Sequence, residues 1–145
     1  MKIEITSDPL DPRALEERVS HQSCGAIVTF VGLVRDHHAG RGVTALDYQA
    51  YPAMCAKVGV AVGDEIRQRW PGARVALTHR IGSLTVGEAS IVIAVASPHR
   101  VEAYEASRYC IDRIKAILPV WKREHYVDGE PTWVSNAEFT PEDPA

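Results

Sequence analysis

The sequence predicts an α+β domain, resembling an α/β hammerhead, in which helices flank one mixed β-sheet with a small antiparallel β extension. Three observations predict this class. Apolar, β-branched stretches such as residues 25–34 alternate along the chain with stretches whose apolar residues recur at helical intervals, such as residues 52–70. A two-residue turn signal at Asp128 and Gly129 adds a hairpin to these crossovers. The 145 residues contain no repeat or linker, so residues 1–145 are predicted to form a single domain.

The first quarter of the chain predicts two strands and a short helix. Ile3 and Ile5 alternate with polar residues, which is typical of a short, half-buried strand. Asp11 and Pro12 are typical of the N-cap and first residue of a helix, because aspartate accepts from a free N–H and proline has none to satisfy. Residues 25–34 are almost continuously apolar, as in a strand buried on both faces.

A polar segment then separates this strand from the next. Residues 35–42 (RDHHAGRG) break the apolar pattern and are predicted to form a loop, and residues 43–51 resume as a strand. From residue 52 the apolar spacing becomes helical. Pro71 and Gly72 end that predicted helix.

The second half begins with two further strands, over residues 74–81 and 90–96. Ser97 and Pro98 then predict the N-cap and first residue of a long helix, which Pro119 ends. After the hairpin that follows, residues 137–145 are expected to form a mobile tail.

Composition and charge exclude several classes of protein. The net charge of −3 argues against nucleic-acid binding, which favours basic domains. No apolar run reaches the roughly 18 residues that a membrane span needs, and the N-terminus lacks a signal-peptide core. We therefore expect a cytoplasmic protein that binds neither nucleic acid nor membrane.

The cysteines and the paired histidines give little support for a metal site. Cys24, Cys55 and Cys110 are odd in number and lack a C-x-x-C spacing, so we expect small buried apolar residues rather than disulfides or zinc ligands. His37 and His38 are adjacent on a loop, so they point in different directions, and no later histidine has a matching ligand spacing. No metal site is predicted.

Basic residues recur where the predicted strands and helices begin or end. They are Arg35, His99, Arg100, Lys115 and Lys122. A cation in the first turn of a helix opposes the helix dipole unless an anion binds there, which makes the histidine–arginine pair informative. Each basic residue also has an ordinary interpretation, as a solvated rim charge, a surface histidine, a snorkelling lysine or part of an exposed charge run. Because strand ends and helix termini meet at one edge of an α/β sheet, the set together predicts a cationic pocket for a phosphorylated small molecule.

Five segments resemble the large, catalytic subunit of molybdopterin synthase. They are GAIVTFVGLVRDH, LDYQAYPAM, ALTHRIGSLTVGE, VASPHRVEAYEASRYCIDRIK and PVWKRE, and the resemblance extends over residues 25–133. It implies a sulfurtransferase of molybdenum cofactor biosynthesis. A small ubiquitin-like partner would supply sulfur from the thiocarboxylate on its C-terminal glycine to cyclic pyranopterin monophosphate, and this would form the dithiolene of molybdopterin. The resemblance also implies a homodimer of large subunits within a heterotetramer, and no metal or cofactor.

The same resemblance implies which residues contact the substrate. They are Phe30, Leu33, Val34, Arg35, His99, Arg100, Ile111, Lys115, Lys122, Arg123 and Glu124. Lys115, Lys122 and Arg35 are the expected catalytic residues: Lys115 as base or transient nucleophile with a lowered pKa, Lys122 as electrostatic support and Arg35 as a phosphate ligand. Leu33 stands where the family often has lysine, and Ile111 where it often has methionine.

Two other functions remain open at this point. The chain would be a non-enzymatic anion-binding or docking module if it had kept the scaffold and lost the reaction, but every expected cationic position is present. An unrelated phosphate-ester enzyme using Arg35 and Lys115 is the second alternative. An assay for dithiolene formation with a thiocarboxylated partner separates all three.

Overall fold

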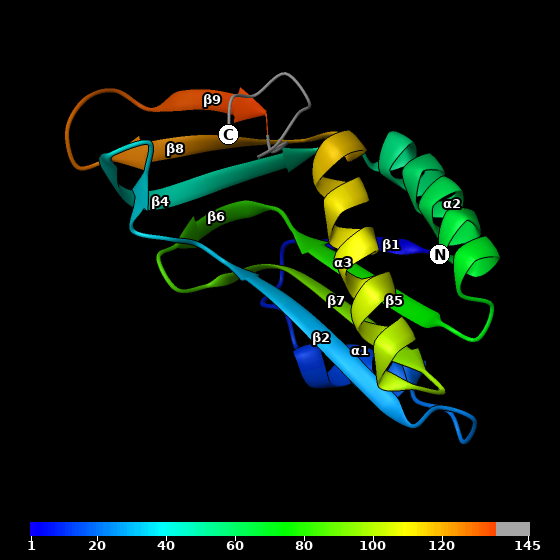
Figure 1. Ribbon diagram of the computed structural model, residues 1–145. Helices are drawn as coiled ribbons and strands as arrows, with labels where there is room; N and C mark the ends of the chain where they lie inside the picture. The colour runs from blue at the N-terminus through cyan, green and yellow to red at the C-terminus, as the bar shows by residue number, and fades with distance from the viewer. Residues whose placement is uncertain (136–145) are drawn as a thin grey trace.

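The computed structural model describes residues 1–135 as two β-sheets and three helices (Figure 1). The elements are, in chain order, β1 (Ile3–Thr6), α1 (Pro12–Val19), β2 (Ala26–Leu33), β3 (His37–His38), β4 (Arg41–Ala50), α2 (Pro52–Arg69), β5 (Arg74–Arg80), β6 (Gly82–Thr85), β7 (Ala89–Ser97), α3 (Arg100–Ile117), β8 (Val120–Tyr126) and β9 (Thr132–Ser135). The expected tail, residues 137–145, lies outside the described residues.

The first sheet has four strands in the order β1-β5-β7-β2, with β1 parallel to β5 and the other pairs antiparallel. Its central strand β7 is buried on both faces, as its apolar run requires. Ile91, Ile93 and Val95 belong to the larger core with α2 and α3, whereas Val92 and Ala94 belong to a smaller core with α1. The sheet is therefore the middle layer between helices (Figure 1).

The second sheet is antiparallel, in the order β3-β4-β8-β9, with β6 paired to the other side of β4. It lies beside the C-terminal end of α3 (Figure 1). The α+β class and the hairpin after β8 are confirmed. The mixed sheet flanked by helices and the antiparallel extension are confirmed as well, and the extension is larger than expected, because β4 and β8 pair with each other and build a separate five-stranded sheet.

The start of α3 differs from the prediction. The helix begins at Arg100 with His99 as N-cap, rather than at Pro98 with Ser97 as N-cap. The reason is tertiary: Ser97 still belongs to β7, and the Gly25 N–H lies 3.1 Å from the Ser97 carbonyl oxygen and 3.2 Å from that of Pro98. The loop predicted over residues 35–42 also contains a short strand, β3, which forms a tight hairpin with β4.

No helix within residues 1–135 is long and apolar enough to cross a membrane.

One histidine lies inside the core. His79, on β5, is 1% exposed and its ring meets that of Tyr48 edge-on, with centroids 5.2 Å apart. Burial is the main cause that lowers the pKa of His79 to about 4. The hydrogen bond between Nδ1 and the Arg80 carbonyl partly opposes this shift, and the nearby charge of Lys115 contributes to it. His79 is therefore a neutral imidazole at neutral pH.

We predict that His79 makes the fold sensitive to acid. Its folded-state pKa lies below the unfolded value of about 6.5, so its contribution is complete above pH 6.5 and is lost as the pH falls toward 4, because the unfolded chain then binds the proton first. The loss is on the order of 3 kcal/mol. Denaturant unfolding of the wild type and of His79→Phe between pH 7 and 4 measures it. A variant with the same pH slope as the wild type would contradict the assignment.

Candidate active site

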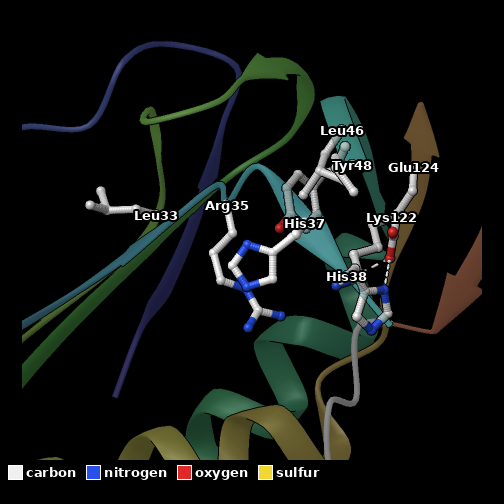
Figure 2. Close-up of a pocket in the computed structure, with 9 residues that line it drawn as sticks. Leu33, Arg35, His37, His38, Leu46, Tyr48, Lys122 and Glu124 are labelled. Carbon is white, nitrogen blue, oxygen red and sulfur yellow. Dashed lines mark hydrogen bonds and ion pairs between the residues drawn. The ribbon is translucent and has the colours of Figure 1, made fainter. Parts of the chain in front are cut away.

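A pocket opens where the end of β2 meets the second sheet. It is lined by Leu33, Arg35, His37, His38, Val43, Leu46, Tyr48, Lys122 and Glu124 (Figure 2). Its enclosed volume is only about 30 Å³ and it is partly open to solvent, so within one chain it is a small recess. Four of these residues were predicted from the sequence as contacts: Leu33, Arg35, Lys122 and Glu124.

The pairing of β4 with β8 determines which side chains face this pocket. Lys122 is directly opposite Tyr48, and Glu124 is directly opposite Leu46. Because alternate residues of a strand share a face, all four side chains project from the same side of the sheet. The sequence also allowed an exposed charge run around Lys122. The structure shows a strand there, and the Lys122 and Glu124 side chains point inward.

These two inward charges form a buried ion pair. The Lys122 and Glu124 side chains are 8% and 1% exposed, and Nζ lies 3.7 Å from Oε1. Leaving either charge alone at such depth would be strongly destabilising. Burial, the negative charge of Glu124 and a side-chain hydrogen bond with Glu124 together raise the pKa of Tyr126, which places a carboxylate charge at this wall of the pocket.

The β3–β4 hairpin adds a histidine to the same carboxylate. Ala39 and Gly40 both adopt positive φ, which turns the chain tightly enough for His38 to face β8. Nδ1 of His38 lies 2.5 Å from Oε1 of Glu124. An ionised carboxylate only accepts, so Nδ1 carries the proton and Nε2 keeps a lone pair. Its neighbour His37 pairs instead with the exposed Asp36, at 2.7 Å.

Lys115 does not line the pocket itself, but its charge acts on a residue behind the pocket. It is in the last turn of α3 and is partly buried. Its charge acts on the buried His79 ring, which contacts Tyr48, and Tyr48 lines the pocket. Lys115, Lys122 and the exposed Arg35 therefore bring positive charge to one region, although they come from three different elements. Such a region favours an anion.

Arg123 faces away from the pocket. Its guanidinium lies 2.7 Å from Oδ2 of Asp47, which also pairs with His125 at 2.6 Å and accepts from the Ser83 hydroxyl at 2.6 Å. Hydrogen bonds from Ser83, His125 and Arg123 hold the pKa of Asp47 well below its usual range. The Arg123 side chain is thus engaged on the opposite face of the second sheet.

The remaining predicted contacts lie elsewhere in the chain. Val34 and Ile111 are buried in the larger core, and Phe30 packs against it. His99 and Arg100 are exposed at the N-terminal end of α3, whereas Lys115 is at its C-terminal end. Fifteen residues of α-helix separate Arg100 from Lys115, a rise of about 22 Å. Within one chain, the expected convergence of all the cations at one edge does not occur.

Sequence reasoning missed the other five pocket residues, which are His37, His38, Val43, Leu46 and Tyr48. The alternation of apolar and polar residues over 43–51 predicts a two-faced strand, which is the only signal for Tyr48. His38 has no sequence signal, because its partner Glu124 is 86 residues away. Within residues 1–135, no group of three or more His, Cys, Asp or Glu side chains is arranged to hold a metal ion.

The sequence comparisons identify relatives over most of the chain. The family model described as "MoaE protein" matches residues 5–117. The molybdopterin synthase catalytic subunit of Halalkalibacterium halodurans is 48% identical over 132 residues, which cover 91% of this chain and 84% of that protein. The subunit of the same name from Bacillus subtilis is 45% identical over 135 residues, 93% of this chain and 85% of that protein.

Comparison with solved structures gives similar proteins of the same kind as the sequence comparison. The crystal structure of molybdopterin synthase from Staphylococcus aureus aligns with a TM-score of 0.85 and 40% identity, covering 90% of this chain and 95% of that one. A complex of subunits 1 and 2 of the molybdopterin-converting factor from Helicobacter pylori aligns with a TM-score of 0.75 at 21% identity, covering 90% of this chain and 88% of that one, and shows the shared fold. With a family match over most of its length and relatives above 40% identity, this chain belongs to the MoaE protein family.

Proposed function

We propose that this chain is the catalytic subunit of a molybdopterin synthase, which transfers sulfur from the C-terminal thiocarboxylate of a small ubiquitin-like carrier to cyclic pyranopterin monophosphate. The observation that carries the proposal is the cationic pocket between Arg35 and Lys122, with Lys115 behind it. Family membership and the names of the relatives support the same assignment. The enzyme is a sulfurtransferase of molybdenum cofactor biosynthesis.

The pocket charges suit both the substrate and the reaction. Arg35 is exposed at the pocket edge, where its guanidinium can bind a phosphate with two hydrogen bonds. Attack involving a thiocarboxylate passes through an anionic tetrahedral centre, and the Lys122 ammonium, held in place by Glu124, would stabilise it. Lys115 is the proposed base or transient nucleophile.

The sulfur would come from the carrier and not from this chain. Cys55 and Cys110 are buried, and burial raises the pKa of both thiols, that of Cys110 to about 12, so neither is a reactive thiolate at neutral pH. The complex of the two H. pylori subunits supports a small partner subunit for this chain as well. All three cysteines are free thiols, as expected of a protein in the reducing cytoplasm, where we place the reaction.

We propose further that two copies of the chain share each active site. If His99 and Arg100 contact the substrate, the length of α3 requires that they reach the pocket of a partner copy. Strand β2 offers the surface for such a dimer, because it is the edge of the first sheet and exposes Ile27, Val31 and Leu33.

Antiparallel pairing of β2 with β2 of a second copy would bring the start of α3 in one copy near the end of β2 in the other. Gly25, just before β2, is hydrogen-bonded to the Ser97 and Pro98 carbonyls, so the start of α3 lies at one end of the strand. Arg35 lies just beyond the other end. A two-fold axis through the middle of β2 would therefore bring Arg100 of the partner subunit toward Arg35.

We predict that Lys115 is essential for sulfur transfer through its ability to lose a proton. Lys115→Ala and Lys115→Arg should both fold and bind the carrier, and both should lose at least about 100-fold in the rate of dithiolene formation, because arginine keeps the charge but not the proton exchange. Single-turnover assays measure this rate, with Lys57→Arg on the exposed face of α2 as the control. Substantial product from Lys115→Arg would show that only the charge matters.

We predict a symmetric homodimer that depends on β2. Light scattering of the isolated chain should give about twice the chain mass of 15.9 kDa. Val31→Lys places a charge in the proposed apolar interface and should give the monomer mass, with the fold retained by circular dichroism. The matched control is Val60→Lys, an exposed valine on α2. A wild-type chain that remains monomeric at micromolar concentration contradicts the dimer, and a dimeric Val31→Lys contradicts this interface.

A further inference from the structure

Sulfur transfer from a thiocarboxylate leaves a bond that must still be broken. When the carrier's sulfur attacks a substrate carbon, that sulfur remains bonded to the carrier's terminal carbonyl, and the product of this step is a thioester. Release of the carrier requires a nucleophile at the carbonyl carbon. Water is the nucleophile present at an open pocket, and a nearby base must accept its proton.

The pocket contains a base that has no role in the function proposed so far. His38 lines the pocket, and its side chain is 41% exposed, so its ring is accessible to water. Nδ1 is bound to the carboxylate of Glu124, which is 1% exposed. A buried carboxylate that holds the Nδ1 proton of a histidine fixes the tautomer and leaves Nε2 free to accept a proton, and it stabilises the imidazolium that then forms.

The contact between His38 and Glu124 is not needed merely to balance the buried charge of Glu124. Glu124 already has the Lys122 ammonium 3.7 Å from the same Oε1, so its charge is balanced without His38. The carboxylate that Lys122 holds in place is therefore able to orient the His38 ring. Figure 2 shows Lys122 and Glu124 extending from β8 toward the His38 ring, with Arg35 on the other side beside His37.

We propose that His38, oriented by Glu124, is the general base that activates water to release the carrier from the thioester. This inference rests on the proposed function. The water oxygen bonds to the carrier's carbonyl carbon while one water proton passes to Nε2 of His38. The carbon–sulfur bond to the carrier then breaks, the sulfur leaves as a thiolate on the pterin, and the carrier departs as a carboxylic acid that loses the second water proton to solvent and becomes a carboxylate. No oxidation or reduction takes place, and water is the sole co-reactant.

The charges around His38 fit this step. Glu124 and Lys122 face it from β8, and Arg35 and His37 line the same pocket from the segment that precedes it. Lys122 and Arg35 would stabilise the tetrahedral oxyanion, as positive groups near developing negative charge do. The negative Glu124 and the positive Lys122 and Arg35 act on the imidazolium in opposite directions, so the carboxylate contact is the feature that favours proton uptake.

The test is a single-turnover reaction with thiocarboxylated carrier and pyranopterin, followed by mass spectrometry. His38→Gln keeps a donor for Glu124 but has no basic nitrogen. We expect release of the carrier to slow by about 100-fold, so that a carrier–pterin conjugate accumulates, while its formation is little changed. The wild-type release rate should fall as the pH is lowered, because a protonated imidazole accepts no proton, and the variant should lose this dependence. His21→Gln, on the exposed loop between α1 and β2, is the control.

Each outcome decides a separate question. Absence of dithiolene from the wild type would contradict the proposed function itself. If the wild type is active and His38→Gln releases the carrier at the wild-type rate and with the wild-type pH dependence, the base assignment is overturned. It is also overturned if His38→Gln forms no conjugate, since His38 would then act before the thioester, or if the carrier becomes attached to this chain rather than to the pterin.

Discussion

The length of α3 is the constraint on which the functional account depends most. An α-helix is rigid over 18 residues, so it fixes the separation of the cations at its two ends. One end is tied to the first sheet through Gly25, and the other places Lys115 beside the second sheet. No rearrangement of loops within one chain brings these ends together. A substrate that needs both ends therefore needs two copies of the chain.

The second constraint is the burial of opposite charges at the pocket. Lys122 and Glu124 would each be costly alone, and together they place a fixed ammonium and a fixed carboxylate beside the reacting groups. Charges that are already in place need no reorganisation when negative charge develops in the reaction. The half-exposed His38 connects this buried pair to solvent. The pocket thus combines a dry, ordered wall with an opening that admits water.

Local pattern predicted the elements well and the long-range geometry poorly. The presence of strand β2, the proline at the start of α2 and the α+β class follow from spacing that the sequence displays directly. The expected burial of β2 on both faces is wrong, because β2 is an edge strand with Ile27, Val31 and Leu33 exposed. The inward direction of Lys122 follows only from the register of β8 against β4, which joins residues more than 70 positions apart. The same is true of the contact between His38 and Glu124. The start of α3 was misplaced because β7 claims Ser97 for the sheet, a tertiary effect that overrides the serine–proline signal.

The most direct test of the shared site is to mix two inactive chains. Lys115→Ala and Arg100→Ala chains are purified separately, mixed, dissociated and allowed to reassociate, and dithiolene formation is assayed at limiting pterin. In a shared site, half of the random dimers combine both chains, and each mixed dimer has one intact pocket with Lys115 from one chain and Arg100 from the other. The account predicts recovery of about one quarter of the wild-type activity. No recovery above the separate variants would contradict the shared site.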